Sequence, residues 1–349
     1  MFIRASWRIL RAAIPVAVVV AGLLPTVPLS SPARAAEEIN VLLALPTNTL
    51  TFTSAFIAED GGFFKKHGLK VEQRFLAGVA SNNAVINGSA DFLLGSIATM
   101  LNGAAMGQPM LMIANMVDKP MVEIVIRKDI AEKAGIKADS PLAERLKLLK
   151  GKTIAVQGIG SMTHSLPRLA ARRGGFDPEG DIRITPMDPA SMLAALANKQ
   201  IDGYSTSLPF TTEAVVKGEG IILVSGPTGD MPEYQPLGYT TLGGRPDKYT
   251  KEREKCARMV AAFADTAKFM KEKPAETYAL VQKRFPKMDP KVLEAAWTVA
   301  AAAHTGDVAV KENTLDNSQK WTLDAGLLDP KNQVKDYKGL WTDEFAKSK

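Results

Sequence analysis

The chain has 349 residues, a formal net charge of +6 and a single cysteine. The first 35 residues contain four arginines and no acidic residue, so the remaining chain has a net charge of only +2. That remainder contains no block of lysine and arginine interleaved with aromatic residues, and we therefore expect no nucleic-acid partner. The lone Cys256 excludes internal disulfides. We expect it to be a buried apolar thiol, because no histidine lies near it in the sequence to act as its base.

Residues 1–35 have the pattern of a secretory signal peptide. Three arginines precede an apolar stretch over residues 12–29, and Ala33 and Ala35 supply the small residues of a cleavage site. We therefore expect cleavage after Ala35 and a periplasmic protein. A retained membrane anchor is the less favoured alternative, because three prolines interrupt the apolar stretch.

The part of the chain after the signal peptide is long enough for two lobes, since one domain usually has about 150 residues. Its first half alternates between strand and helix patterns. Strands are predicted at 39–45, 71–75 and 91–94, and helices at 53–67 and 81–86, the second capped by Ser81. This alternation predicts a parallel sheet of βαβ units.

The second half repeats this plan. Further strands at 108–116 and 122–127 lead into a polar helical segment at 129–149. The alternation then restarts with strands and helices in turn at 153–157, 161–173, 182–186, 189–198 and 203–205. From residue 250 onward the pattern is strongly helical, with Trp297 and Trp321 as core candidates.

Two short segments indicate the same repetition locally. Residues 87–92 and 198–203 each close a predicted helix and open a predicted strand, and Ser96 and Ser205 stand just past these strands. Because open parallel sheets bind ligands at the carboxyl ends of their strands, we expect both serines to face a cleft.

Four strand-to-helix junctions carry glycine or short polar residues, at 46–49, 78–82, 96–99 and 157–164. Such groups orient a small molecule, and the N–H groups of a helix start favour a polar or anionic oxygen. Each junction alone also fits an ordinary helix cap. The last one resembles a dinucleotide fingerprint only in part, because Thr163 stands where the third glycine would be.

The histidines give no sign of a metal site, since His67, His164 and His304 lie far apart without ligand spacing. We expect His67 and His304 to be structural and His164, in the cleft loop, to be a candidate ligand contact. No G-x-S-x-G elbow, P-loop or H-E-x-x-H motif occurs. The sequence therefore predicts a binding protein without a cofactor, not an enzyme.

The segment from Ala55 to Val71 resembles the opening helix of the nitrate/sulfonate/taurine group of ABC-transporter periplasmic substrate-binding proteins, in the thiamine-pyrimidine-synthase-like superfamily. That helix characteristically runs A-x-x-x-G-x-F-x-x-x-G-L-x-V. The similarity continues through Gly88 to Asp91, Leu149 to Val156 and Leu193 to Asp202, and it covers about residues 39–275.

The resemblance implies a type II periplasmic binding fold, with two Rossmann-like lobes, a central cleft and two crossing segments. Residues 36–121 and 236–349 would form lobe 1, and residues 122–235 lobe 2. The implied function is a monomeric receptor that captures a small anionic or polar organic ligand, similar to a sulfonate, carboxylate or heterocycle. It would close its lobes on that ligand and deliver it to an inner-membrane ABC permease with its ATPase.

Carried over position by position, the resemblance places ligand contacts at Asn48, Ser81, Ser96, Ile97, Ser161, Met162, Thr163, Ser205 and Leu208. Pyrimidine-synthase-like enzymes share the fold, although Cys256 alone cannot supply their cysteine-rich motif. Such an enzyme, and a binding subunit that feeds a sensor or another transporter class, remain alternatives. Whether Arg127 or Arg168 reaches the cleft is open from the sequence.

Overall fold

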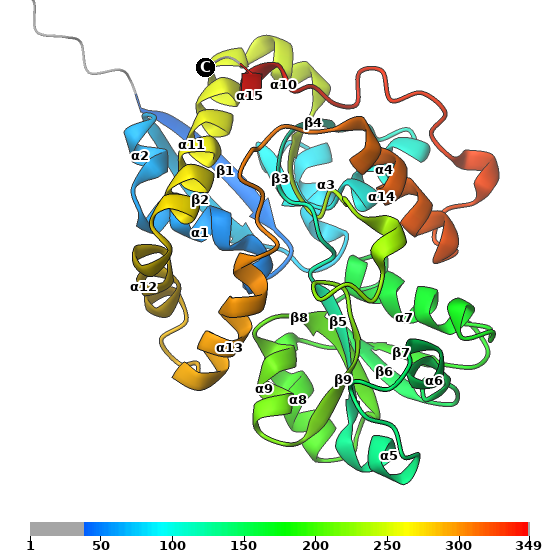
Figure 1. Cartoon of the computed structure of the whole chain (residues 1–349). Coiled ribbons are helices and arrows are strands. Elements are labelled where there is room, and N and C mark those ends of the chain that lie inside the picture. The colour runs from blue at the N-terminus through cyan, green and yellow to red at the C-terminus, as the bar shows by residue number, and fades with distance from the viewer. Residues whose placement is uncertain (1–37, 348–349) are drawn as a thin grey trace, which may run out of the picture. The chain divides into compact units, whose positions relative to one another are not determined.

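The computed structural model describes residues 38–347 (Figure 1), so the predicted signal peptide and its cleavage site lie outside the described residues. Two five-stranded sheets with helices around them form the framework, which confirms the predicted α/β fold class. None of the helices within residues 38–347 combines the length and apolar character needed to cross a membrane.

The first sheet has the strand order β2-β1-β3-β10-β4. It consists of β1 (Ile39–Leu45), β2 (Leu69–Phe75), β3 (Phe92–Gly95), β4 (Leu111–Val117) and β10 (Thr240–Gly244). Strand β1 runs parallel to β2 and β3, as the βαβ pattern predicts. Strand β10 is antiparallel to both β3 and β4. The predicted parallel βαβ arrangement of the first three strands is confirmed, and β10 adds an antiparallel strand because the chain returns from the second sheet in the opposite direction.

The second sheet has the order β7-β6-β8-β5-β9. Its strands are β5 (Val122–Arg127), β6 (Thr153–Val156), β7 (Arg183–Pro186), β8 (Gly203–Ser207) and β9 (Gly220–Ser225). Here β5 is antiparallel to β8 and β9, while β6 is parallel to β7 and β8. The associated helices are α5 (Lys128–Lys133), α6 (Leu142–Lys147), α7 (Met162–Arg173), α8 (Pro189–Ala197) and α9 (Phe210–Val216).

Helices of the first sheet come from both ends of the chain. They are α1 (Thr53–Asp60), α2 (Phe63–Lys66), α3 (Ala80–Ile86), α4 (Ile97–Ala105), α10 (Pro246–Lys251), α11 (Arg253–Glu272), α12 (Pro274–Arg284), α13 (Pro290–Ala301), α14 (Glu312–Asp324) and α15 (Glu344–Lys347). The predicted helix over 53–67 is divided into α1 and α2, because Gly62 adopts a φ of 75° that ends regular helix.

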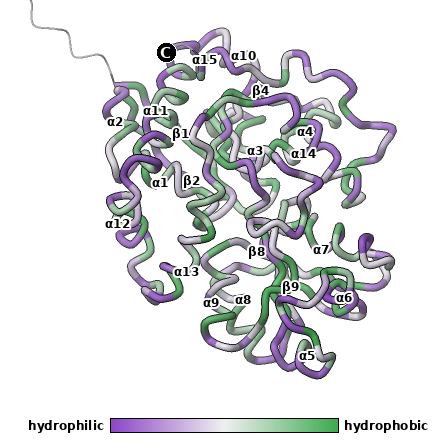
Figure 2. Tube along the Cα trace, in the orientation of Figure 1, coloured by the Kyte–Doolittle hydropathy of each residue, from purple (hydrophilic) through white to green (hydrophobic). Residues whose placement is uncertain are grey.

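Apolar residues of α2 and α11 form part of the core beside the first sheet. Phe64 and Phe263 are both buried, and their rings meet edge to face with centroids 5.6 Å apart. Trp321 of α14 is fully buried, as predicted, whereas Trp297 is only partly buried. Figure 2 shows mainly hydrophobic chain around β9, whereas hydrophilic and hydrophobic residues alternate along α12.

The predicted local repeat has a structural basis. Gly88 and Lys199 both have a positive φ, 83° and 57°, just after a helix ends. Asp91 then accepts a hydrogen bond of 2.8 Å from the Leu42 N–H of β1, and Asp202 accepts one of 2.9 Å from the Thr153 N–H of β6. In both sheets, the aspartate just before one strand thus binds a backbone N–H group of the neighbouring strand.

Two chain segments connect the sheets, one between β4 and β5 and the other between β9 and β10. They are hydrogen bonded to each other, because Leu237 N–H donates to the Asp118 carbonyl at 2.6 Å and Tyr239 N–H donates to the Val117 carbonyl at 2.9 Å. Helix α14 makes a further contact with α7, where Trp321 Nε1 donates to Ser165 Oγ at 2.7 Å.

His304, between α13 and α14, is a partly buried histidine with a structural role, as the sequence predicts. Its Nδ1 lies 3.0 Å from the Ala300 carbonyl, and its Nε2 is buried without a hydrogen-bond partner. Burial lowers the pKa of His304 to about 4, because a charged ring would lose its hydration. The ring is therefore neutral in the folded protein at pH 7.

This pKa predicts a pH-dependent stability. The unfolded chain binds a proton at His304 below about pH 6.5 and the folded chain does not, so the free energy of unfolding falls as the pH drops toward 4. Between pH 7.5 and 4.5 the loss from this group is about 2–3 kcal/mol. Urea unfolding of the wild type and of His304→Gln measures it, since the variant lacks this component. Equal pH dependence in both proteins would contradict the assignment.

Candidate functional site

A small cavity of about 60 Å³ lies where loops of the two sheets meet. The first sheet contributes Thr47, Val79 and Ser96 from the loops after β1, β2 and β3. The second sheet contributes the loop after β6 and Ser207 at the end of β8. We call this space the deep cavity. Hydroxyl, amide, apolar and aromatic groups line it, and among the described residues no charged side chain does.

Two helices begin at the deep cavity. Ser96 caps α4 and accepts a hydrogen bond of 3.2 Å from the Thr99 N–H, and Ser161 caps α7 and accepts one of 3.4 Å from the His164 N–H. The first N–H groups of a helix have no partner within it and carry partial positive charge. The deep cavity therefore favours a polar or partly negative oxygen without containing a formal cation.

The loops on either side touch through glycine. A Cβ atom placed on Gly158 would lie 2.9 Å from the Cα of Gly78, closer than real Cβ contacts occur. One placed on Gly160 would lie 3.1 Å from Cγ1 of Val79. A separate backbone hydrogen bond also links the two sides, because the Leu50 N–H donates to the Leu208 carbonyl at 2.9 Å. Glycine at 158 thus permits a backbone approach that any side chain would prevent.

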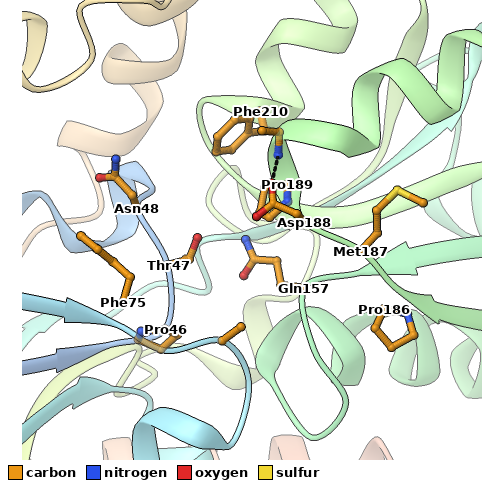
Figure 3. A pocket seen from close by; sticks show the side chains of 12 residues that line it. Pro46, Thr47, Asn48, Phe75, Gln157, Pro186, Met187, Asp188, Pro189 and Phe210 are labelled. Carbon is orange, nitrogen blue, oxygen red and sulfur yellow. Dashed lines mark hydrogen bonds between the residues drawn. The ribbon is translucent and has the colours of Figure 1, made fainter. Parts of the chain in front are cut away.

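A larger cavity of about 670 Å³ adjoins the deep cavity and shares Pro46, Thr47 and Gln157 with it. We call it the outer cavity. Figure 3 shows side chains from both sheets around it, including those of Phe75 and Phe210. Its one charged lining residue among those described is Asp188, whose carboxylate accepts from the Ala190 N–H at 2.9 Å and caps α8.

His164 stabilises the loop after β6 by a hydrogen bond to the loop's backbone. Its Nδ1 accepts a hydrogen bond of 3.1 Å from the Gly160 N–H. Burial, with the nearby Arg168 guanidinium, lowers the pKa of His164 and keeps this nitrogen free to accept. The ring lines a different depression, together with Arg168 and Glu179, and does not line the deep or outer cavity. In this structure the ring holds the loop, and its contact with a ligand stays a prediction.

Five of the ten predicted ligand contacts line one of the two cavities. Asn48 lines the outer cavity, and the residues that line the deep cavity are Ser96, Ser161, Met162 and Thr163. Their contact with a ligand stays a prediction.

The other predicted contacts lie behind the site. Ser81 does not cap α3 but lies inside it, and its hydroxyl donates to the Gly78 carbonyl at 3.1 Å. Ile97 is buried against Gly238. Ser205 is a buried residue within β8 and not past its end. Leu208 is buried and supplies its carbonyl to Leu50.

Neither arginine that the sequence left open lines the cavities. Arg127 Nε donates to Asp129 at 2.9 Å, and its guanidinium lies 3.8 Å from Asp202. Arg168 forms an ion pair with Glu179 and donates to the Ala325 carbonyl at 3.0 Å. Both guanidinium groups are used to hold chain segments together.

Several lining residues were not among the predicted contacts. Phe75 ends β2 and Phe210 begins α9 just after β8, so the rule that ligands bind at the carboxyl ends of strands could have identified both. Gln157 was in a predicted junction, and its amide donates to Thr206 Oγ1 at 2.6 Å. Tyr239 follows the second crossing segment, where no strand-end pattern marks it.

Within residues 38–347, no group of three or more histidine, cysteine, aspartate or glutamate side chains is arranged to hold a metal ion. Cys256 is buried in α11, and burial raises the pKa of its thiol to about 11. The thiol is therefore protonated at neutral pH and is a poor nucleophile.

Several known proteins are similar to this chain. The nitrate import ATP-binding protein NrtC of Synechocystis is 30% identical over 188 residues, which are 48% of this chain and only 26% of NrtC. The chain thus spans about a quarter of that relative. The putative binding protein YtlA of Bacillus subtilis is 22% identical, over 84% of each chain.

Solved structures share the fold at lower identity. A protein of Bordetella bronchiseptica superposes with a TM-score of 0.74 at 22% identity, over 88% of this chain and 95% of that one. The periplasmic aliphatic sulphonate binding protein SsuA of Escherichia coli superposes with a TM-score of 0.65 at 17% identity, over 87% of this chain and 97% of SsuA. The desulfurization enzyme DSZB superposes with a TM-score of 0.59 at 14% identity, over 88% of this chain and 97% of DSZB.

The model of the NMT1-like family matches residues 40–283. This range contains all strands of both sheets except the first residue of β1, and it contains every residue that lines the deep cavity. Because the match spans more than half of the sequence, the chain belongs to the NMT1-like family, and the predicted resemblance to the nitrate- and sulfonate-binding group is confirmed.

Proposed function

We propose that this chain is the exported substrate-binding receptor of an ABC importer and captures a small polar organic molecule between two lobes. The deep cavity carries the proposal, because loops of both sheets enclose it without a charged side chain among the described residues. Residues 36–121 with 236–349 and residues 122–235 would be the two lobes. The receptor would act as a periplasmic monomer and deliver its ligand to a permease with its ATPase.

The names of similar proteins support an import role. NrtC is named for nitrate import, YtlA as a putative binding protein and SsuA as a periplasmic sulphonate binding protein. DSZB shows that this fold also occurs in an enzyme. In this chain, however, no histidine, lysine or cysteine among the described residues lines either cavity beside the hydroxyl groups, so no activated nucleophile is formed there.

The arrangement of the two cavities supports a ligand with a polar head and an organic body. Hydroxyl groups and two helix starts surround the deep cavity, which suits an oxygen-bearing head. Phe75, Phe210 and Met187 line the outer cavity and offer apolar and aromatic contact to the body. A bare inorganic anion such as nitrate would leave this outer surface unused.

Capture would proceed by closure of the lobes about the crossing segments. The ligand would first contact the loops of one lobe. The loops that carry Gly78 and Gly158 would meet only when the other lobe closes on the ligand. The ligand shifts the protein toward this closed form by its higher affinity for it. A permease can then distinguish loaded from empty receptor by a surface that both lobes form.

The first test is to identify a bound molecule. Native mass spectrometry of the purified protein, followed by thermal-shift measurements with aliphatic sulfonates, aromatic carboxylates and N-heterocycles, should yield at least one compound that binds and is recovered unchanged. A ligand at 100 times its Kd adds about 2.7 kcal/mol to the free energy of unfolding. If every compound leaves stability unchanged, or a bound compound is chemically converted, the receptor proposal is wrong.

The second test blocks closure directly. Gly158→Ala places a methyl group 2.9 Å from the Gly78 Cα, and the φ of Gly158 lies outside the left-handed region, so the isolated loop tolerates alanine. We expect at least tenfold weaker binding of the compound identified above with little change in the melting temperature of the ligand-free protein. Isothermal titration calorimetry and differential scanning calorimetry measure the two quantities.

Gly180→Ala is the matched control for this variant. Gly180 also has an ordinary φ, and its added methyl group would meet only the Asp177 side chain, away from both cavities. Its ligand affinity should equal that of the wild type. Unchanged affinity in Gly158→Ala as well would show that the glycine contact does not form in the bound state.

A further inference from the structure

Two hydroxyl groups lie together in the deep cavity, the phenol of Tyr239 and the side chain of Ser207. Tyr239 immediately precedes β10, and Ser207 is the last residue of β8, so the two groups come from different sheets. Both residues are almost fully enclosed, since only 5% of Tyr239 and 3% of Ser207 is exposed. The Ser207 hydroxyl is the hydrogen-bond neighbour of the Tyr239 phenol. We call these two groups the hydroxyl pair.

The hydroxyl pair carries one more proton than the protein can use. Among the described residues, neither oxygen forms a hydrogen bond outside the pair. Each hydroxyl has one proton, and a bond within the pair uses only one of the two. Whichever group donates, the other O–H is left without an acceptor. Both oxygens remain open to the cavity, whereas the Thr51 hydroxyl beside them is enclosed without a partner. The unused proton therefore calls for an acceptor inside the cavity.

The size and surroundings of the deep cavity indicate what this acceptor is. A volume of about 60 Å³ has room for about two to four water molecules, and thus for a small head group of a few atoms. Burial raises the pKa of Tyr239, so the phenol keeps its proton at neutral pH and can donate it. The helix start at Ser161 offers further N–H donors to the same space. The missing partner is therefore an acceptor oxygen of a small head.

The hydroxyl pair also lies beside the connections between the two sheets. The Tyr239 N–H donates to the carbonyl of Val117, the last residue of β4, at 2.9 Å. Ser207 lies opposite Val122, the first residue of β5, in the second sheet. Val117 and Val122 are the two residues that flank the first crossing segment. A molecule bound to the hydroxyl pair would thus contact the part of the chain about which the lobes would close.

We propose that the hydroxyl pair is the innermost ligand contact and acts as a unit that donates one hydrogen bond to an oxygen of the ligand's head. Tyr239 and Ser207 then select the head, because a group without an acceptor oxygen leaves the buried proton unpaired. Since the pair lies beside the crossing segments, the same bond links ligand capture to closure. The inference rests on the proposed receptor function, because it requires that the deep cavity hold ligand.

A double-mutant cycle tests whether the two hydroxyls act as a unit. Benzenesulfonate is the probe, because its head carries acceptor oxygens and its ring suits the outer cavity. Tyr239→Phe and Ser207→Ala each remove one oxygen and keep most of the packing. By isothermal titration calorimetry, we expect about tenfold weaker binding for Tyr239→Phe and about threefold weaker binding for Ser207→Ala. The double variant should bind at most about twofold more weakly than Tyr239→Phe, because both changes remove the same hydrogen bond.

Tyr278→Phe is the matched control, since Tyr278 lies on α12 and lines neither the deep nor the outer cavity. Its affinity for benzenesulfonate should equal that of the wild type. Unchanged affinity in Tyr239→Phe, or losses that multiply in the double variant, would contradict the proposal. A merely structural pair would lower the melting temperature of the ligand-free variants and leave their affinities unchanged.

A crystal structure with benzenesulfonate provides the geometric test. One sulfonate oxygen should lie within hydrogen-bond distance of Tyr239 Oη or Ser207 Oγ. A water molecule in that position, the probe in the outer cavity alone, or binding at crystal concentration only would each overturn the proposal.

The outcome also distinguishes this inference from the receptor function. If benzenesulfonate does not bind the wild type, the same cycle is measured with the compound that native mass spectrometry identifies. A compound that binds the wild type and Tyr239→Phe equally leaves the receptor in place and removes the hydroxyl pair from its site. If no small molecule binds the wild type at all, the receptor function fails and the role of the hydroxyl pair fails with it.

Discussion

The pairing of the two crossing segments is the constraint on which the rest of the structure depends. Hydrogen bonds from Leu237 to Asp118 and from Tyr239 to Val117 keep both connections side by side. Strand β10 continues from this pairing into the middle of the first sheet, antiparallel to β3 and β4. The carboxyl ends of β1, β3, β6 and β8 therefore face one another, and Tyr239 itself reaches the deep cavity. The proposed hinge and the candidate binding site are thus parts of one hydrogen-bonded unit.

The polarity of the site comes from dipoles and not from ions. Ser96 and Ser161 each fix the first turn of a helix at the deep cavity, and burial keeps His164 neutral behind the second of these turns. A ligand that binds such a site loses water but does not have to desolvate a charged side chain. This moderates the free energy of capture, which suits the proposed receptor, since such a receptor must also release its ligand.

Local sequence pattern predicted much of the fold but less of the site. Strand ends follow from apolar runs and their boundaries, and β1 appears at the predicted residues. The antiparallel direction of β10 could not be predicted, because it depends on where the chain returns from the second sheet. The hydrogen bond that the Gly160 N–H donates to the His164 ring could not be predicted, because sequence spacing does not show which way the ring turns. Tyr239 is distant in sequence from every junction that the pattern marked.

The contact between α14 and α7 restricts how the proposed lobes can open. Trp321 donates to Ser165 in a fully buried hydrogen bond, and separating the two would leave both polar groups unsatisfied. The contact between Gly78 and Gly158 involves no such bond and can separate at little cost. Opening should therefore rotate the lobes about an axis near the crossing segments and α14. The segment after α14, whose Ala325 carbonyl accepts from Arg168 of α7, would then stay with α7 while the glycine loops part.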